Sequence, residues 1–340
     1  MDATDVKTTL RWLVPVSIGL CLALFWLLSA SAVPWARPVA GRSGPTKKDA
    51  EVHEIDAERA FGYLLMQCRL GPRPTGSAAQ ERLRIALERH FSKLGYTVQR
   101  QRFVFAHPLR QRPVTGANIV ARWQPNRRER VLLAAHYDTR PNADEDPRPR
   151  PYLGANDGAS GVALLMELAH QLPKFELSVG VDLVCFDAEE LVYGHSAGLQ
   201  RGEYCLGSKH FARLYRSAGR RRVRYRAAIV LDMVAGKGAV FYPERYSVER
   251  AGWLVDELWT MAASLQANSF QQPRFGRRWG YEIYDDHVPL LEVGIPAVDI
   301  IDFDYEHWHR SSDRPENCSA AVLGEVGKVV LTWLVRAYRR

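Results

Sequence analysis

The chain has 340 residues, which is enough for one large α/β domain or two smaller ones. Its hydrophobic content of 46% and charged content of 25% are ordinary for a globular protein. The net charge is +8, but arginine is spread through the chain and no nucleic-acid-binding motif accompanies it. We therefore expect no nucleic-acid partner. The five cysteines form no C-x-x-C pair, so a structural zinc knuckle is not expected.

The first 50 residues divide into three parts. Residues 1–11 form a short tail, residues 12–33 carry no charged side chain, and residues 34–50 are rich in Pro, Gly and basic residues, as linkers are. The uncharged run is about long enough to cross a bilayer and is longer than a usual signal-peptide core, so we expect a transmembrane anchor. Ala30-Ser31-Ala32 resembles a signal-peptidase site, so a cleaved signal sequence is the alternative. Residues 51–340 would then be extracytoplasmic, either anchored to the membrane by a single span or secreted or periplasmic after cleavage.

Residues 51–340 are predicted to alternate between helices and strands. The expected helices cover about residues 56–70, 77–94, 162–172, a short stretch after Ser208, 247–265, a short stretch at 289–293, and 320–338. The expected strands cover about residues 96–105, 117–123, 131–135, 181–187, 227–233 and 297–301. This alternation indicates a twisted, mostly parallel central sheet with helices on both faces. We predict a single catalytic domain of three α/β/α layers.

Polar side chains stand where several of these strands are predicted to end. They are His136, Asp138, Glu189, Glu190 and Asp232. In a largely parallel sheet, ligands bind beyond the carboxyl ends of the strands. Because all five residues fall at that one edge, we expect them to form a site.

Glu189 and Glu190 are the centre of this expected site. They follow residues 181–187, an apolar run that suits a strand covered on both faces. Adjacent buried carboxylates repel each other and lose hydration, so such a pair usually needs a cation or a proton between them. A metal would supply the cation, with one Glu as its ligand and the other facing the substrate as a base. For this stretch alone, the alternative is a solvated junction between strand and loop.

Asp157 and His309 complete a set of residues suited to zinc. Carboxylates and imidazoles are common Zn²⁺ ligands, and the glycines around Asp157 let the backbone approach a metal closely. Taken alone, His136 would more often be a buried core histidine, Asp157 a helix N-cap and Asp232 a cap at a strand end. The whole set, in this order, predicts a metal site.

Five motifs follow one another along the chain. They are His136-Tyr137-Asp138, residues 156–161 (Asn-Asp-Gly-Ala-Ser-Gly), residues 186–190 (Phe-Asp-Ala-Glu-Glu), residues 231–233 (Leu-Asp-Met) and the terminal His309. Together they resemble the zinc aminopeptidase family of the bacterial leucyl aminopeptidase type. The resemblance covers about residues 51–340 and implies the fold of that family. Glutaminyl-peptide cyclotransferases, the glutaminyl cyclases of the animal and Bacteroidetes type, share the fold and most of these residues.

Three further features resemble the cyclases more than the aminopeptidases. Residues 70–77 (Leu-Gly-Pro-Arg-Pro-Thr-Gly-Ser) resemble a loop near the start of cyclase domains. The spacer from Glu190 to residues 204–208 is long, as in cyclases. Residues 285–287 (Asp-Asp-His) and 308–309 (Trp-His) resemble two cyclase motifs, whereas aminopeptidases more often have Ser-Asp-His and lack the Trp.

Two departures from the animal cyclases resemble a bacterial-type member. Asp299 stands where animal enzymes carry a His, and Bacteroidetes-type enzymes also tend to have Asp there. Ala135 and Val162 occupy the places of the cysteine pair that flanks the metal loop in animal enzymes.

The resemblance to the cyclases implies a substrate and a cofactor. The substrate would be a peptide or protein with an N-terminal Gln, whose α-amine attacks its own side-chain amide and releases ammonia. Because the nucleophile belongs to the substrate, one Zn²⁺ suffices. Its ligands would be Asp157, Glu190 and His309.

The same resemblance implies roles for the remaining residues. Glu189 would take the amine proton and return it to the leaving nitrogen, as general base and then acid. Asp285 would hold the amide nitrogen or relay the proton, and Trp308 would pack against the substrate side chain. Taken alone, Asp285 could instead be a helix N-cap and Trp308 a core aromatic. His287 and Asp299 are further candidates for the same pocket.

A zinc aminopeptidase is the alternative function. His136 and Asp232 would then join as ligands of a second Zn²⁺, Asp157 would bridge the two ions, and Glu189 would activate the attacking water. In the cyclase hypothesis His136, Asp138 and Asp232 only support the site, so the ligand set does not separate the two functions. A third hypothesis, an inactive binding domain on the same fold, is disfavoured because Glu189 and the metal set are intact.

Overall fold

The computed structural model describes residues 53–340, apart from residues 110–111, 195–197, 219–222 and 274–276. The expected tail, transmembrane or signal segment and linker all lie outside these residues. Within the described part of the chain, no helix combines the length and apolar character that crossing a membrane requires. The expected anchor at residues 12–33 therefore stays a prediction.

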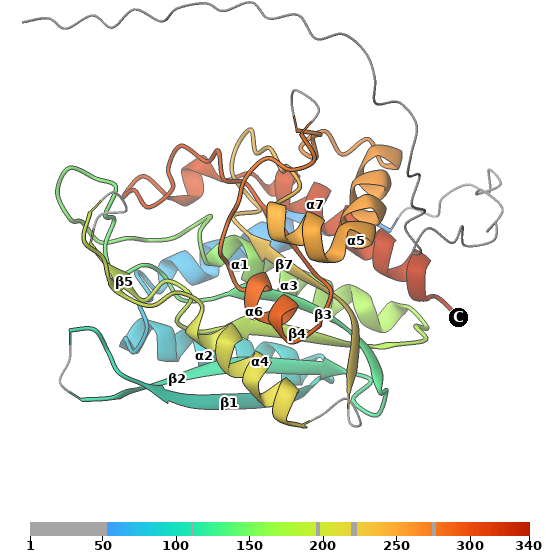
Figure 1. Cartoon of the computed structure of the whole chain (residues 1–340), viewed down its shortest axis with the longest axis horizontal. Coiled ribbons are helices and arrows are strands. Elements are labelled where there is room, and N and C mark those ends of the chain that lie inside the picture. Colours follow the sequence, from blue (N-terminus) through green and yellow to red (C-terminus); the bar gives the residue numbers. More distant parts are fainter. Residues whose placement is uncertain (1–52, 110–111, 195–197, 219–222, 274–276) are drawn as a thin grey trace, which may run out of the picture. The chain divides into compact units, whose positions relative to one another are not determined.

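A six-stranded mixed sheet forms the centre of the described domain, in the order β1-β2-β4-β3-β7-β8 (Figure 1). The strands are β1 (Thr97–Phe105), β2 (Val114–Trp123), β3 (Glu129–His136), β4 (Gly180–Phe186), β7 (Arg224–Asp232) and β8 (Ala297–Ile301). Strands β4, β3, β7 and β8 pair in parallel, whereas β2 pairs antiparallel with both β1 and β4. Of these six strands only β2 runs against the others, so the predicted mostly parallel sheet is confirmed.

Helices cover both faces of this sheet. They are α1 (Ala57–Arg69), α2 (Ala78–Lys93), α3 (Ala159–Gln171), α4 (Leu206–Ala218), α5 (Arg245–Ser264), α6 (His287–Glu292) and α7 (Ala320–Tyr338), with short 3-10 turns η1 (Leu172–Lys174) and η3 (Pro315–Asn317). Helix α3 packs on β3 and β7, and α1, α2 and α7 contact α3. On the other face α4 and α6 pack together, and Phe211 of α4 meets Phe186 of β4 edge to face. The three α/β/α layers are as predicted.

The chain's local chemistry explains why the predicted bounds hold so closely. Every residue of β4 is buried, as expected for an interior strand with helices on both sides. The side chains of Asp56, Ser77 and Ser319 each accept a backbone hydrogen bond and cap α1, α2 and α7. The observed bounds of β8 and α7 match the predicted ones. Helix α4 is longer than the short helix predicted after Ser208, and the other bounds differ by a few residues.

Two differences have clear causes. Strand β2 begins at Val114, three residues before the predicted start, because it pairs with β1 along its whole length and Val114 lies opposite Phe105. The long spacer between Glu190 and residues 204–208, where no strand was predicted, contains a small antiparallel ribbon of β5 (Val192–Tyr193) and β6 (Arg201–Gly202). Two-residue strands leave no periodic pattern in a sequence.

A buried ion pair ties the interior strands together at the edge opposite the predicted site. Arg130 of β3 is fully buried, and its Nε donates to Asp182 Oδ1 of β4 at 2.8 Å. It also donates to the backbone carbonyl oxygens of Trp123 at 2.8 Å and Val181 at 3.0 Å. The arginine therefore satisfies a buried carboxylate and two backbone groups at once.

We expect Arg130→Met to lower the free energy of unfolding by about 3–5 kcal/mol, because it removes the buried cation that pairs with the buried Asp182 carboxylate. Urea denaturation followed by circular dichroism measures the change. The matched control is Arg226→Met, which breaks an exposed ion pair with Glu129 and should cost only about 0–1 kcal/mol. Equal urea midpoints of unfolding for Arg130→Met and Arg226→Met would contradict the expectation.

Candidate active site

Asp187 fixes the turn that follows β4 and carries the Glu189–Glu190 pair. It is fully buried, and its Oδ2 accepts hydrogen bonds from Arg84 Nη2 of α2 and from the backbone N–H of Ala117, both at 2.6 Å. The next residue, Ala188, has a φ of +56°, a left-handed conformation that is uncommon outside glycine. The turn after β4 is therefore held by α2 and β2 in a conformation that the chain would not adopt by itself.

Asp138, two residues after the end of β3, holds the backbone of the same pair. Its Oδ1 accepts the backbone N–H of Glu189 and its Oδ2 accepts that of Glu190, each at 3.1 Å. Thr75 also donates its hydroxyl to Asp138 Oδ2, at 3.2 Å. Since both oxygens are used in this way, Asp138 supports the site instead of facing a ligand.

Asp157, Glu190 and His309 come together as expected. Their ligand atoms all lie within 4.8 Å of one another, and all three side chains are buried. His309 Nε2 is 3.2 Å from Glu190 Oε1 and 3.7 Å from Asp157 Oδ2. Two buried carboxylates and one imidazole nitrogen around a common point form a donor set that suits Zn²⁺. A cation there would offset the repulsion between the acids.

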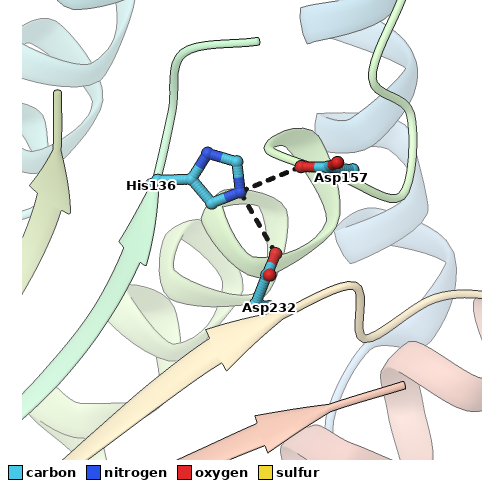
Figure 2. A group of neighbouring side chains, drawn as sticks. All are labelled: His136, Asp157 and Asp232. Atoms are coloured by element: carbon cyan, nitrogen blue, oxygen red, sulfur yellow. Dashed lines mark hydrogen bonds and ion pairs between the residues drawn. The ribbon is translucent and has the colours of Figure 1, made fainter. Parts of the chain in front are cut away.

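His136 and Asp232 form a second group with the same Asp157 (Figure 2). His136 Nε2 points between the two carboxylates, 3.2 Å from Asp157 Oδ1 and 3.1 Å from Asp232 Oδ1. Burial lowers the pKa of His136, but Asp232 and the other acids outweigh it and raise the pKa well above its usual value. Burial raises the pKa of Asp232 to about 7, although His136 opposes the shift. A protonated His136 would thus bridge the two carboxylates.

Two hydrogen bonds and a close backbone contact hold Asp157 in place. The Tyr152 hydroxyl donates to Asp157 Oδ2 at 2.8 Å, and the backbone N–H of Asp157 donates to Asp313 Oδ2 at 3.1 Å. The following Gly158 has a φ of +96°, and a Cβ there would clash with the backbone carbonyl of Asp138. Only glycine therefore lets this loop pass so close to the end of β3.

A cavity of about 200 Å³ opens over these groups. Its walls include Glu189, Asp285 and Trp308, and the three residues of the first metal group also line it. The Trp308 ring stacks on the His309 imidazole, with centroids 3.8 Å apart and planes 23° apart. Drug-sized ligands occupy pockets of about 300–1,000 Å³, so this cavity suits a single amino-acid side chain.

The two adjacent glutamates have opposite electrostatic environments. Burial and the neighbouring Glu190 raise the pKa of Glu189 well above its usual value. Burial also opposes ionisation of Glu190, but His309 and Arg140 outweigh it and lower the Glu190 pKa. One carboxyl is therefore suited to carrying a proton and the other to remaining charged, the pattern expected of an acid/base residue beside a cation ligand.

Asp285 faces Glu189, and it also lies close to His287 and Asp299. A ligand oxygen of Asp285 lies within 4.8 Å of one on Glu189, and another group joins Asp285 to His287 and Asp299. His287 Nε2 is 2.8 Å from Glu244 Oε2, and its Nδ1 is 3.6 Å from Asp299 Oδ2. Burial and Asp285 raise the pKa of Asp299 well above its usual value. His287 and Asp299 thus support Asp285 and do not belong to the cavity wall.

Sequence reasoning missed several residues that support the site. They are Arg140, Asp144, Tyr152, Tyr204 and Asp313, whose contacts reach the expected metal ligands or the cavity. Four of the five are buried. Each lies in a loop, where charged and aromatic residues are ordinarily exposed, so no spacing or periodicity marks them.

These features define an α/β/α protein with a buried acid–histidine site at the carboxyl edge of a mostly parallel sheet. The model of peptidase family M28 matches residues 118–334. The chain belongs to that family.

Solved structures and a curated relative add detail. The crystal structure of Fimbriiglobus ruber glutaminyl cyclase is 40% identical, with a TM-score of 0.79, over 86% of this chain and 99% of that one. The crystal structure of a Zn-dependent exopeptidase from Parabacteroides distasonis is 31% identical, with a TM-score of 0.74, over 85% and 100% of the two chains. The glutaminyl-peptide cyclotransferase-like protein of Mus musculus is 25% identical over 87% of this chain and 80% of its own length. The predicted fold and the predicted resemblance are both confirmed.

Proposed function

We propose that this chain is a zinc-dependent glutaminyl-peptide cyclotransferase, which converts the N-terminal Gln of peptides or proteins to pyroglutamate and releases ammonia. The 40% identity to a glutaminyl cyclase over 86% of the chain supports this function. The cavity, with Glu189, Asp285 and Trp308 in its walls, suits one side chain.

One observation carries the choice of reaction. Glu189 and Asp285 face each other within 4.8 Å, in the cavity that Trp308 lines. Both reactions take a proton from the nucleophile and deliver one to a leaving amide nitrogen, but the nucleophile is water in hydrolysis and the substrate's own amine in cyclisation. The two facing acids suit such a transfer in either reaction. The indole beside them suits the aliphatic part of a Gln side chain and keeps water away.

Zinc fits the first group of ligands. Asp157, Glu190 and His309 would hold it, because their donor atoms converge and are of the types that zinc prefers. Bound there, zinc polarises the carbonyl of the substrate's side-chain amide. Asp138 and Asp313 keep the backbone of two ligands in place through the hydrogen bonds described above.

Residues of the protein then transfer one proton. The substrate's α-amine nitrogen bonds to the side-chain amide carbon, closing a five-membered ring, and the bond from that carbon to the amide nitrogen breaks. Glu189 takes the proton from the amine and gives it to the leaving nitrogen, which departs as ammonia. Asp285 holds that nitrogen across the cavity from Glu189. Confinement of amine and amide in a small cavity contributes through proximity.

A zinc aminopeptidase is the second candidate. The group of His136, Asp157 and Asp232 has the composition of a second metal site, and the similar exopeptidase is described as Zn-dependent. In the cyclase, a proton on His136 Nε2 would take the place of that second ion between the two carboxylates.

A pair of substrates separates the two functions. The purified full chain with zinc should release ammonia from Gln-β-naphthylamide and leave Leu-p-nitroanilide intact. Ammonia is followed by a coupled assay and the free arylamines by absorbance or fluorescence. Chelator-treated protein is the control and should lose the activity. Hydrolysis of the Leu substrate without ammonia from the Gln substrate would refute the cyclase and support the aminopeptidase.

A further inference from the structure

The loop between β3 and α3 contains a buried ion pair that reaches two of the proposed zinc ligands. Arg140 is fully buried, and its Nε donates to Asp144 Oδ2 at 2.7 Å. Its Nη1 donates to Glu190 Oε2 at 3.1 Å. Asp144 Oδ1 in turn lies 3.4 Å from His309 Nδ1. One pair thus contacts a carboxylate ligand and an imidazole ligand.

Arg140 determines which oxygen of Glu190 faces the site. It occupies Oε2, so Oε1 is the oxygen directed at His309 Nε2, 3.2 Å away. Tyr204 covers the arginine from the cavity side, with its hydroxyl accepting from Arg140 Nη1 at 3.1 Å and its ring 5.5 Å from the guanidinium carbon. The guanidinium, held at several points, has little freedom to turn away.

Asp144 lies against the imidazole nitrogen of His309 that is not directed at the other proposed ligands. In the described part of the chain, neither Asp144 Oδ1 nor His309 Nδ1 has a hydrogen-bond partner, although both are buried. These two atoms lie 3.4 Å apart, so the Asp144 carboxylate faces His309 Nδ1, while Nε2 faces Asp157 and Glu190.

The backbone around His309 is tied to the same loop. His309 has a φ of +54°, so its conformation needs support from its surroundings. Its carbonyl oxygen accepts the backbone N–H of Glu145 at 3.1 Å, and Arg310 donates to the Glu145 carbonyl at 2.8 Å. The loop that contains Arg140 and Asp144 therefore holds both the side chain and the main chain of His309.

We propose that Arg140 and Asp144 are positioning residues that lock Glu190 and His309 in the orientation for zinc and thereby set the affinity of the site. The proposal rests on the proposed function only for the identity of the metal. It gives the charged loop after β3 a role that its sequence does not indicate.

The variants Arg140→Met and Arg140→Lys distinguish a positioning role of Arg140 from an effect of its charge alone on zinc affinity. Removing a cation near a cation site would by itself tighten zinc binding, and a lysine would leave the charge unchanged. Positioning makes the opposite prediction for Arg140→Met: zinc binds about 10–100-fold more weakly, as is typical when a residue supporting a metal ligand is lost. The zinc affinity of Arg140→Lys should lie between those of Arg140→Met and the wild type. The lysine ammonium keeps the charge but lacks the planar guanidinium group that hydrogen-bonds Asp144 and Glu190 together.

The measurement is the dissociation constant of Zn²⁺ for the chelator-treated full chain, by competition with a chromophoric chelator. Thermal unfolding of the zinc-free variants shows whether they are folded. Asp144→Asn, which keeps the size of the side chain, should also weaken zinc binding by about 10-fold or more. Arg148→Met, an exposed arginine in the same loop, is the matched control and should bind zinc as the wild type does.

Zinc binding by folded Arg140→Met that is equal to or tighter than wild type would overturn the proposal. If Arg140→Met does not fold, the zinc affinities of Arg140→Lys and Asp144→Asn test the proposal instead. Wild-type zinc affinity in both of these variants would also overturn the proposal. Because zinc affinity is measured without substrate, an absence of ammonia release would refute the cyclase function and leave this result standing.

Discussion

Glu189→Gln is expected to lower ammonia release from Gln-β-naphthylamide by about 10²–10⁴-fold, the usual contribution of a general acid/base. The glutamine has the same shape but cannot take the amine proton. The backbone N–H that bonds Asp138 remains, so the turn after β4 should keep its conformation. Zinc should stay at wild-type occupancy, since Glu189 is not in the group of Asp157, Glu190 and His309.

Turnover measured at saturating substrate, together with zinc content after gel filtration, tests this expectation. Glu176→Gln is the matched control, because it makes the same chemical change at an exposed position and should leave kcat unchanged. Near-normal activity of Glu189→Gln would show that another group moves the proton. Loss of zinc along with activity would instead place Glu189 among the ligands.

The second large effect is expected from Asp157→Ala. Asp157 belongs to both groups of metal-type side chains, so its loss disrupts the site whether the protein holds one zinc or two. We expect zinc affinity to fall by more than about 100-fold, beyond the 10–100-fold typical when only a supporting residue is lost. Activity should disappear with the metal.

The zinc content of His136→Ala, measured together with that of Asp157→Ala, distinguishes a site with one zinc from a site with two. The cyclase function expects one zinc per chain in the wild type and one in His136→Ala, because this imidazole is absent from the group of Asp157, Glu190 and His309. The aminopeptidase function expects two in the wild type and a loss of one in the variant. Asp256→Ala, on the exposed side of α5, is the control for removing a carboxylate and should change neither count.

Much of the fold could be predicted because its strands and helices carry strong local signals. The interior strands are continuous apolar runs, and β4 is buried at every residue. Serine or aspartate caps begin three of the helices. The reversed direction of β2 has no such local signal, since it depends on which neighbours a strand pairs with.

The site was predictable to the extent that it lies at strand ends. Strand polarity places His136, Glu190 and Asp232 at one edge of the sheet, and the structure brings each into one of two groups around Asp157. What surrounds them was not predictable. Arg140 and Asp313 reach the site from loops, and only the packed fold determines that a charged loop residue is buried beside a carboxylate.

The parallel core has a consequence for how the protein becomes active. Asp157, Glu190 and His309 span more than 150 residues of sequence and meet only after β3, β4 and the chain beyond β8 have assembled. A partly folded chain would thus lack a high-affinity site for the proposed zinc, which would bind the folded state alone. Such linkage adds about 2.7 kcal/mol of stability at a free zinc concentration of 100 times the dissociation constant. Zinc supply would then govern how long the enzyme survives as well as how fast it works.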